Sequence, residues 1–153
     1  MQRRSVSVGF AVVLLLALAT GSASAKQPAT IARTVSLTED ATLKATPHPG
    51  NAIHEQGQAT GTYRCRITVD LRIVSVSSVT ASFTVIPQGG TVSGRGTARY
   101  VAKGAFGYAG GTLTITGGTG KFAHASGTNI GFSAKVNRET LSASVHVHGT
   151  VHL

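Results

Sequence analysis

Apolar and polar residues alternate along most of the chain after residue 25, and this alternation restricts the fold more than any other feature. It is clearest between residues 63 and 73. One side of that segment carries Tyr63, Cys65, Ile67, Val69, Leu71 and Ile73, and the other carries Arg64, Arg66, Thr68, Asp70 and Arg72. A period of two is typical of a β-strand with one packed face and one face in water. Beyond residue 25 no segment of helical length shows a 3.6-residue period, so the sequence predicts an all-β domain.

Turn signals divide this alternation into about eight short strands. We expect strands in the ranges 31–37, 41–46, 58–76, 79–85, 91–103, 105–115, 130–136 and 141–151. Glu39 and Asp40 are interpreted as a turn-like break, and residues 47–51 as a long rim loop, because prolines cannot continue a strand ladder. The 58–76 run exceeds the usual strand length, so we expect a bulge in it or a break near Ser75. A β-sandwich and a closed antiparallel barrel both fit this pattern.

The first 25 residues form a predicted signal peptide. A basic start with Arg3 and Arg4 precedes an apolar run, and the small residues Ala23, Ser24 and Ala25 follow it. The apolar run is shorter than the ~20 residues that a membrane-spanning helix needs. We therefore divide the chain into a signal peptide, residues 1–25, and one domain, residues 26–153. We expect this domain to be secreted by the general or the twin-arginine route and to lack a membrane span after cleavage.

Basic residues outnumber acidic ones in the predicted exported domain. It carries 12 basic and 5 acidic residues, a net charge of +7, once Arg3 and Arg4 are removed with the leader. Such a balance attracts anionic polymers. No cluster of five or more basic residues is present, however, and aromatic residues are too sparse to form a stacking platform. We therefore predict no nucleic-acid partner.

The single cysteine, Cys65, lies in the apolar phase of its strand. An internal disulfide is therefore impossible. We expect a buried free thiol, with an intermolecular disulfide as the alternative.

The glycine-rich segment Gly117-Gly118-Thr119-Gly120-Lys121 is similar to a phosphate-binding loop, but its flanks do not fit one. The residue after the lysine is Phe122 rather than serine or threonine, and the position five before the last glycine is Ile115 rather than glycine. A dinucleotide-binding turn needs a long helix after its glycines, and Gly127 leaves no room for one. We predict no nucleotide and no other cofactor.

Three histidines, His146, His148 and His152, share the polar face of the last expected strand, and a His-x-His pair can bind zinc. They are weak candidates because no carboxylate accompanies them on that strand, so we predict no metal site. No Gly-x-Ser-x-Gly nucleophile motif is present, and Asp70, between two arginines, is interpreted as a surface ion pair rather than a general base. We assign no catalytic residue.

The segment from residue 113 to residue 127 resembles the signature of the allene oxide cyclase and dirigent superfamily. In that family a Gly-Gly-Thr-Gly-x-Phe-x-x-Ala-x-Gly turn joins two barrel strands, and the matching residues here are Gly117, Gly118, Thr119, Gly120, Phe122, Ala125 and Gly127. The whole chain also resembles small exported bacterial proteins with such a barrel. The resemblance implies an eight-stranded antiparallel β-barrel with an internal cavity, often assembled as a homodimer or homotrimer, and a structural role for the turn residues.

This chain also departs from the named members of that family. Cys65 alone cannot form the disulfide typical of plant dirigents. Neither the acidic cavity residues of the dirigents nor the catalytic carboxylate of the cyclases has a matching position here.

The inward phase of such a barrel contains four aromatic residues, which we predict to line the cavity: Tyr63, Phe83, Tyr100 and Phe132. Ordinary core packing of the same four residues is the alternative. Many other inward-phase residues are alanine or glycine, which favours residual space. We predict a non-catalytic barrel that binds a small apolar or aromatic ligand. The alternatives are an isomerase or cyclase, for which the strand phases supply no clear inward polar residue, and a surface or matrix protein without a ligand.

Overall fold

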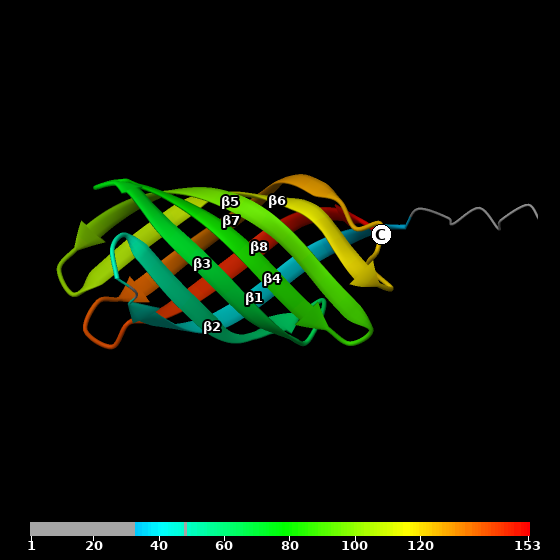
Figure 1. The fold of residues 1–153 in the computed structure, drawn as a ribbon, viewed down its shortest axis with the longest axis horizontal. Coiled ribbons are helices and arrows are strands. Elements are labelled where there is room, and N and C mark those ends of the chain that lie inside the picture. The colour runs from blue at the N-terminus through cyan, green and yellow to red at the C-terminus, as the bar shows by residue number, and fades with distance from the viewer. Residues whose placement is uncertain (1–32, 48) are drawn as a thin grey trace, which may run out of the picture. The chain divides into compact units, whose positions relative to one another are not determined.

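Eight antiparallel strands form a closed β-barrel in the computed structural model, which describes residues 33–47 and 49–153. The strands are β1 (Thr34–Pro47), β2 (Ala52–Gly61), β3 (Cys65–Ser75), β4 (Ser78–Pro87), β5 (Gly90–Lys103), β6 (Phe106–Gly120), β7 (Gly127–Asn137) and β8 (Ser142–His152). Each strand pairs with the next, and β1 pairs with β8 to close the sheet (Figure 1). The predicted fold class is confirmed. The predicted signal peptide lies outside the described residues.

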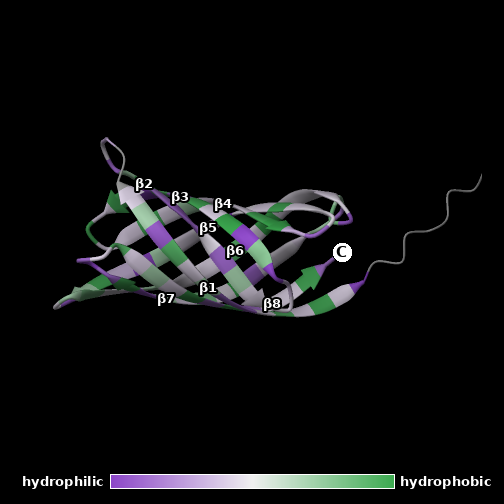
Figure 2. Cartoon of the chain, turned by 90° about the horizontal axis from the view of Figure 1, so that it is seen from below, coloured by the Kyte–Doolittle hydropathy of each residue, from purple (hydrophilic) through white to green (hydrophobic). Residues whose placement is uncertain are grey.

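Alternation along the strands separates the interior of the barrel from its surface. Figure 2 shows hydrophobic and hydrophilic patches following one another along the same strand. In β8, for example, Ala143, Val145 and Val147 line the interior, whereas His146 and His148 lie exposed on the outside. Within the described ranges, no segment forms a helix of the length and apolarity needed to cross a membrane.

The N-terminal strand differs from the prediction. β1 is one continuous strand of 14 residues, and the expected break at Glu39 and Asp40 does not occur. Glu39 pairs with Gly61 of β2 on one side and with Val147 of β8 on the other. Ladders on both sides hold the backbone extended, and they override the turn preference of two consecutive acidic residues.

The 58–76 run breaks near Ser75 as expected, because β3 ends there beside an irregularity in the pairing between Ile73 and Ser75. It also contains a turn that was not predicted, at residues 62–64 between β2 and β3. The expected rim loop is shorter than predicted, because Pro47 still pairs with Ile53. The glycine-rich segment belongs to β6 up to Gly120, so the turn itself covers residues 121–126.

The two ends of the barrel differ in packing. At one end, here called the Phe122 end, Phe122, Ala125 and Val151 are 4–6% exposed and belong to one apolar cluster. The Tyr63 ring meets the Phe122 ring edge-on, with centroids 5.8 Å apart. At the other end, here called the Leu141 end, Ile73, Val76 and Leu141 are 37–97% exposed. The barrel is therefore packed at the Phe122 end and more open at the Leu141 end.

The β6–β7 turn closes the Phe122 end through close backbone contacts. Gly120 has φ +59°, and the N–H of Lys121 donates to the carbonyl of Gly89 at 2.9 Å. A Cβ on Gly118 would lie 2.3 Å from the Phe122 carbonyl oxygen and 2.5 Å from that of Thr91. Glycine at these positions lets the chain fold back tightly enough to bury Phe122. The structural role expected for this segment fits these contacts.

Candidate functional site

The interior of the barrel contains a cavity of about 560 Å³ with predominantly apolar walls. All eight strands contribute to its lining. Within the described residues, Ile130 is the only large side chain less than 2% exposed, whereas inward residues such as Val69, Leu113 and Val145 keep part of their surface accessible. Their free surface faces the cavity, so these side chains do not fill the barrel. The volume of the cavity lies in the range of ~300–1,000 Å³ that is usual for small-molecule pockets.

The four aromatic residues singled out from the sequence lie in the cavity wall: Tyr63, Phe83, Tyr100 and Phe132. Two of them lie close to glycines of a neighbouring strand. A Cβ on Gly94 would lie 2.4 Å from the Phe83 ring, and one on Gly107 would lie 2.2 Å from the Tyr100 hydroxyl. The glycines accept the rings against the wall and so leave the centre of the barrel unfilled. Ligand binding by these four residues stays a prediction.

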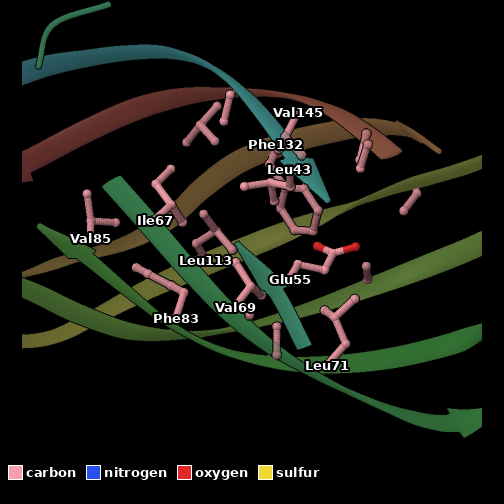
Figure 3. A pocket seen from close by; sticks show the side chains of 18 of the residues that line it. Leu43, Glu55, Ile67, Val69, Leu71, Phe83, Val85, Leu113, Phe132 and Val145 are labelled. Carbon is pink, nitrogen blue, oxygen red and sulfur yellow. The ribbon is translucent and has the colours of Figure 1, made fainter. Parts of the chain in front are cut away.

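Glu55 of β2 is one of the polar residues that line this cavity. Its backbone lies opposite Ala45 of β1 and opposite Val69, the middle residue of the inward row of β3, so it sits about halfway along that strand. Figure 3 shows the carboxylate pointing into the space bordered by Leu43, Leu71 and Phe132. The labelled neighbours in this view are all hydrocarbon, which makes Glu55 an isolated acid in an apolar chamber.

The Glu55 carboxylate is buried without compensation. The residue is 7% exposed, and among the described residues no group hydrogen-bonds or pairs with its side chain. Burial therefore raises the pKa of Glu55 above the usual 4.5 of a glutamate, because a desolvated carboxyl group favours its neutral form. An unpaired buried carboxyl group is costly, and such costs are typical of functional positions.

Glu39 of β1 is the second inward acid, nearer the Phe122 end, and it is held by the chain itself. Its Oε1 accepts a hydrogen bond of 2.7 Å from the N–H of Tyr63. Its Oε2 is buried and has no hydrogen-bond partner in the described part of the chain. Burial raises the pKa of Glu39; the Tyr63 hydrogen bond opposes that shift and the charge of Asp40 adds to it.

The charges that line the cavity are mostly negative in an otherwise basic chain. The lining includes Glu39, Glu55 and Arg138, and thus two of the five acidic residues in the sequence. Arg138 lies exposed at the Leu141 end, where its Nη1 donates to the carbonyl of Gly104 at 3.0 Å. The strand phases supplied no clear inward polar residue, whereas Glu39 and Glu55 both line the cavity. The sequence indicates the inward position of these two acids only weakly. Glu39 falls among the odd-numbered apolar residues of β1. The odd-numbered residues around Glu55 in β2 are Ile53, Gly57 and Ala59, which are too weakly apolar to define an inward face.

Cys65 is a free thiol inside the barrel, as the sequence predicts. It is 7% exposed and packs in the cluster with Leu43 and Ala59. Burial, with a smaller contribution from the charge of Glu39, raises the pKa of the Cys65 thiol to about 11. Both effects suppress the reactive thiolate. The alternative of an intermolecular disulfide does not fit this position.

The three histidines of β8 lie on the outer surface and are not brought together as a metal site. His146 and His148 stack at 6.0 Å, and His152 shares a hydrogen bond of 3.1 Å with Thr34. Across the described residues, no group of three or more potential metal ligands forms. A carboxylate does approach one of them from the neighbouring strand, because Nδ1 of His146 lies 2.8 Å from the Asp40 carboxylate.

Asp70 forms a surface pair, but with a partner that sequence reasoning missed. Its carboxylate lies 2.7 Å from Nδ1 of His54, the residue directly opposite on β2. Cross-strand register, rather than the flanking arginines of β3, selects the partner. Neither this pair nor the His146 pair reaches the cavity.

Comparison with known proteins adds no further constraint, since no family model, curated protein or solved structure matches this chain.

Proposed function

We propose that this protein is an exported, non-catalytic barrel of the allene oxide cyclase and dirigent type, and that it binds a small apolar or aromatic ligand inside the barrel. The observation that carries this proposal is the cavity of about 560 Å³, walled by inward-facing aliphatic and aromatic side chains. Apolar side chains bordering an unfilled space recover dispersion contacts and lose hydrated surface when a ligand occupies it. This size also counts against a ligand-free matrix protein, whose barrel would gain stability from a filled core.

The arrangement of the two ends supports the same proposal. The Phe122 cluster packs one end, while Ile73, Val76 and Leu141 give the other an apolar rim. A ligand entering at the Leu141 end therefore meets apolar surface from the rim to the aromatic wall.

A fluorescence titration with the neutral apolar dye N-phenyl-1-naphthylamine tests this function. We expect saturable binding with a blue-shifted emission. Ala134 lines the cavity, so Ala134→Leu, which places a larger side chain in the cavity, is expected to weaken dye binding by about tenfold. Ser133, the exposed neighbour on the same strand, provides the matched control Ser133→Leu, which should bind like the wild type. Equal effects of both substitutions, or no saturable binding, would refute the proposal.

An isomerase or cyclase in the same cavity is the second candidate, and Glu55 is the observation that favours it. A buried carboxyl group of raised pKa can act as a general acid or base near neutral pH. Chromatography and NMR of the small molecule recovered after incubation with the protein separate the two candidates, because a binder returns its ligand unchanged and an isomerase returns a rearranged isomer of equal mass. Native mass spectra of the purified protein report whether the barrel forms the homodimer or homotrimer that the family resemblance implies.

A further inference from the structure

The polar groups in the cavity wall restrict the class of ligand further than the apolar lining alone does. Polar groups in an otherwise apolar pocket orient the ligand and set its specificity. Here the isolated polar group halfway along the wall is the Glu55 carboxyl group, which is 7% exposed, points into the cavity and has no partner among the described residues (Figure 3). Glu39 does not play the same part, because its Oε1 already accepts the Tyr63 N–H and its unpaired Oε2 is buried.

We infer that the ligand of this cavity is an apolar or aromatic amine whose protonated nitrogen pairs with the Glu55 carboxylate while its hydrocarbon part fills the barrel. This inference rests on the proposed ligand-binding function and specifies the class of ligand.

Complementarity of charge and hydrogen bonding favours an amine over other polar groups. An ammonium group offers several N–H donors, so it can donate to both carboxylate oxygens, and it also neutralises the buried charge. A ligand carbonyl would use only the single donor of a protonated carboxyl group. A ligand carboxylate would be repelled by Glu55 and Glu39, and the cation that lines the cavity, Arg138, lies at the Leu141 end, where its guanidinium binds the Gly104 carbonyl.

Proton exchange accompanies such binding in a defined direction. Burial favours the protonated form of free Glu55, so the carboxyl group must release its proton before it can pair with an ammonium. The products are the carboxylate–ammonium pair in the cavity and one proton in the buffer. The other titratable groups in the lining are Glu39, Tyr63, Cys65, Tyr100 and Arg138.

Three probes of equal length and different head groups test the inference: phenylbutylamine, phenylbutanol and phenylbutanoate. Isothermal titration calorimetry near pH 6 should give the amine the tightest binding, about tenfold or more tighter than the alcohol, with the acid weakest. In Glu55→Gln the advantage of the amine over the alcohol should fall to about twofold or less. Asp70→Asn removes an acid from the outer surface and should leave the order unchanged.

A readout on the wild-type protein does not depend on the folding of any variant. Between pH 4.5 and the raised pKa of Glu55, amine binding should release protons, which appears as a binding enthalpy that varies with the ionisation enthalpy of the buffer. Phenylbutanol should release none.

The outcomes distinguish this inference from the function on which it rests. Equal affinity for the amine and the alcohol, tightest binding of the acid, or an amine advantage that persists in Glu55→Gln would overturn the inference and leave the ligand-binding function intact. Failure of both the alcohol and N-phenyl-1-naphthylamine to bind would overturn the function itself.

Discussion

The carboxylate of Glu39 accepts a hydrogen bond from the backbone N–H of Tyr63 at 2.7 Å, and this contact links β1 to the turn that follows β2. The Tyr63 and Phe122 rings in turn form a T-shaped pair with an interplanar angle of 88°. One inward acid is thus used to position an aromatic pair at the Phe122 end. The other, Glu55, has no such use in the described structure.

Removal of the Glu55 charge should stabilise the empty barrel near neutral pH. Glu55→Gln keeps the shape of the side chain and removes the cost of a desolvated carboxyl group, so we expect a gain of about 1–3 kcal/mol in the free energy of unfolding. Chemical denaturation at pH 7 measures this gain. A loss of stability would show that the Glu55 carboxylate has a stabilising partner.

The stability of the wild-type barrel should fall as pH rises above the ordinary glutamate pKa of 4.5. Glu39 and Glu55 have raised pKa values in the folded state, so the folded protein binds more protons than the unfolded chain between 4.5 and those raised values. The free energy of unfolding therefore decreases across that window and levels off above it. Denaturation curves of wild type and the Glu39→Gln, Glu55→Gln double variant, measured from pH 4 to pH 8, should differ in this slope. Parallel pH dependences of the two proteins would contradict the raised pKa values of Glu39 and Glu55.

Truncation of Phe122 should destabilise the barrel much more than truncation at the Leu141 end. Phe122 is 6% exposed, so Phe122→Ala is expected to cost about 3–5 kcal/mol. Val76 at the Leu141 end is 97% exposed, and Val76→Ala should change stability by less than about 0.5 kcal/mol. Thermal unfolding of the two variants compares the ends directly, and equal losses would contradict the difference in packing.

Substitution by alanine should have different effects on stability at two adjacent glycines. A Cβ on Gly118 would meet two backbone carbonyl oxygens within 2.5 Å, whereas one on Gly117 would meet nothing within 4 Å. We expect Gly118→Ala to cost about 1–3 kcal/mol or more and Gly117→Ala to be neutral or slightly stabilising. Urea denaturation of both variants measures the contrast. Similar values would show that the close approach beside Gly118 relaxes easily.

Cys65 should be unreactive while the barrel is folded. With a thiol pKa of about 11, only about one part in a thousand is thiolate at pH 8, and the residue is buried as well. Alkylation followed by mass spectrometry should show no modification of the native protein over hours and complete modification in denaturant. Rapid labelling of the native protein would indicate that the interior near β3 opens often.

Strand phase was the part of this structure that the sequence determined best. Regular alternation in β3 and β8 identified inward and outward residues, because a one-residue shift in register would move every apolar side chain to the face in contact with water. The same evidence placed Tyr63, Phe83, Tyr100 and Phe132 on the interior face. Counting phase continuously from residue 58 to residue 76, however, hid the turn at residues 62–64, because Tyr63 and Cys65 remain in step across it.

The two inward acids show where such reasoning fails. Two consecutive acidic residues, Glu39 and Asp40, are typical of a turn, and only the ladders to β2 and β8 keep that backbone extended. The position of Glu55 follows from register with Val69 rather than from a local pattern. Cross-strand pairs such as His54 with Asp70 depend on register in the same way, and register is a property of the closed barrel rather than of any one segment.

Methyl NMR with bound phenylbutanol tests whether the barrel interior is a ligand site. We expect intermolecular nuclear Overhauser effects from the probe to the methyl groups of Val69, Leu71 and Val145, which line the cavity, and none to Val101, which is 64% exposed and outside the lining. Contacts to Val101 with none to the three inward residues would contradict it.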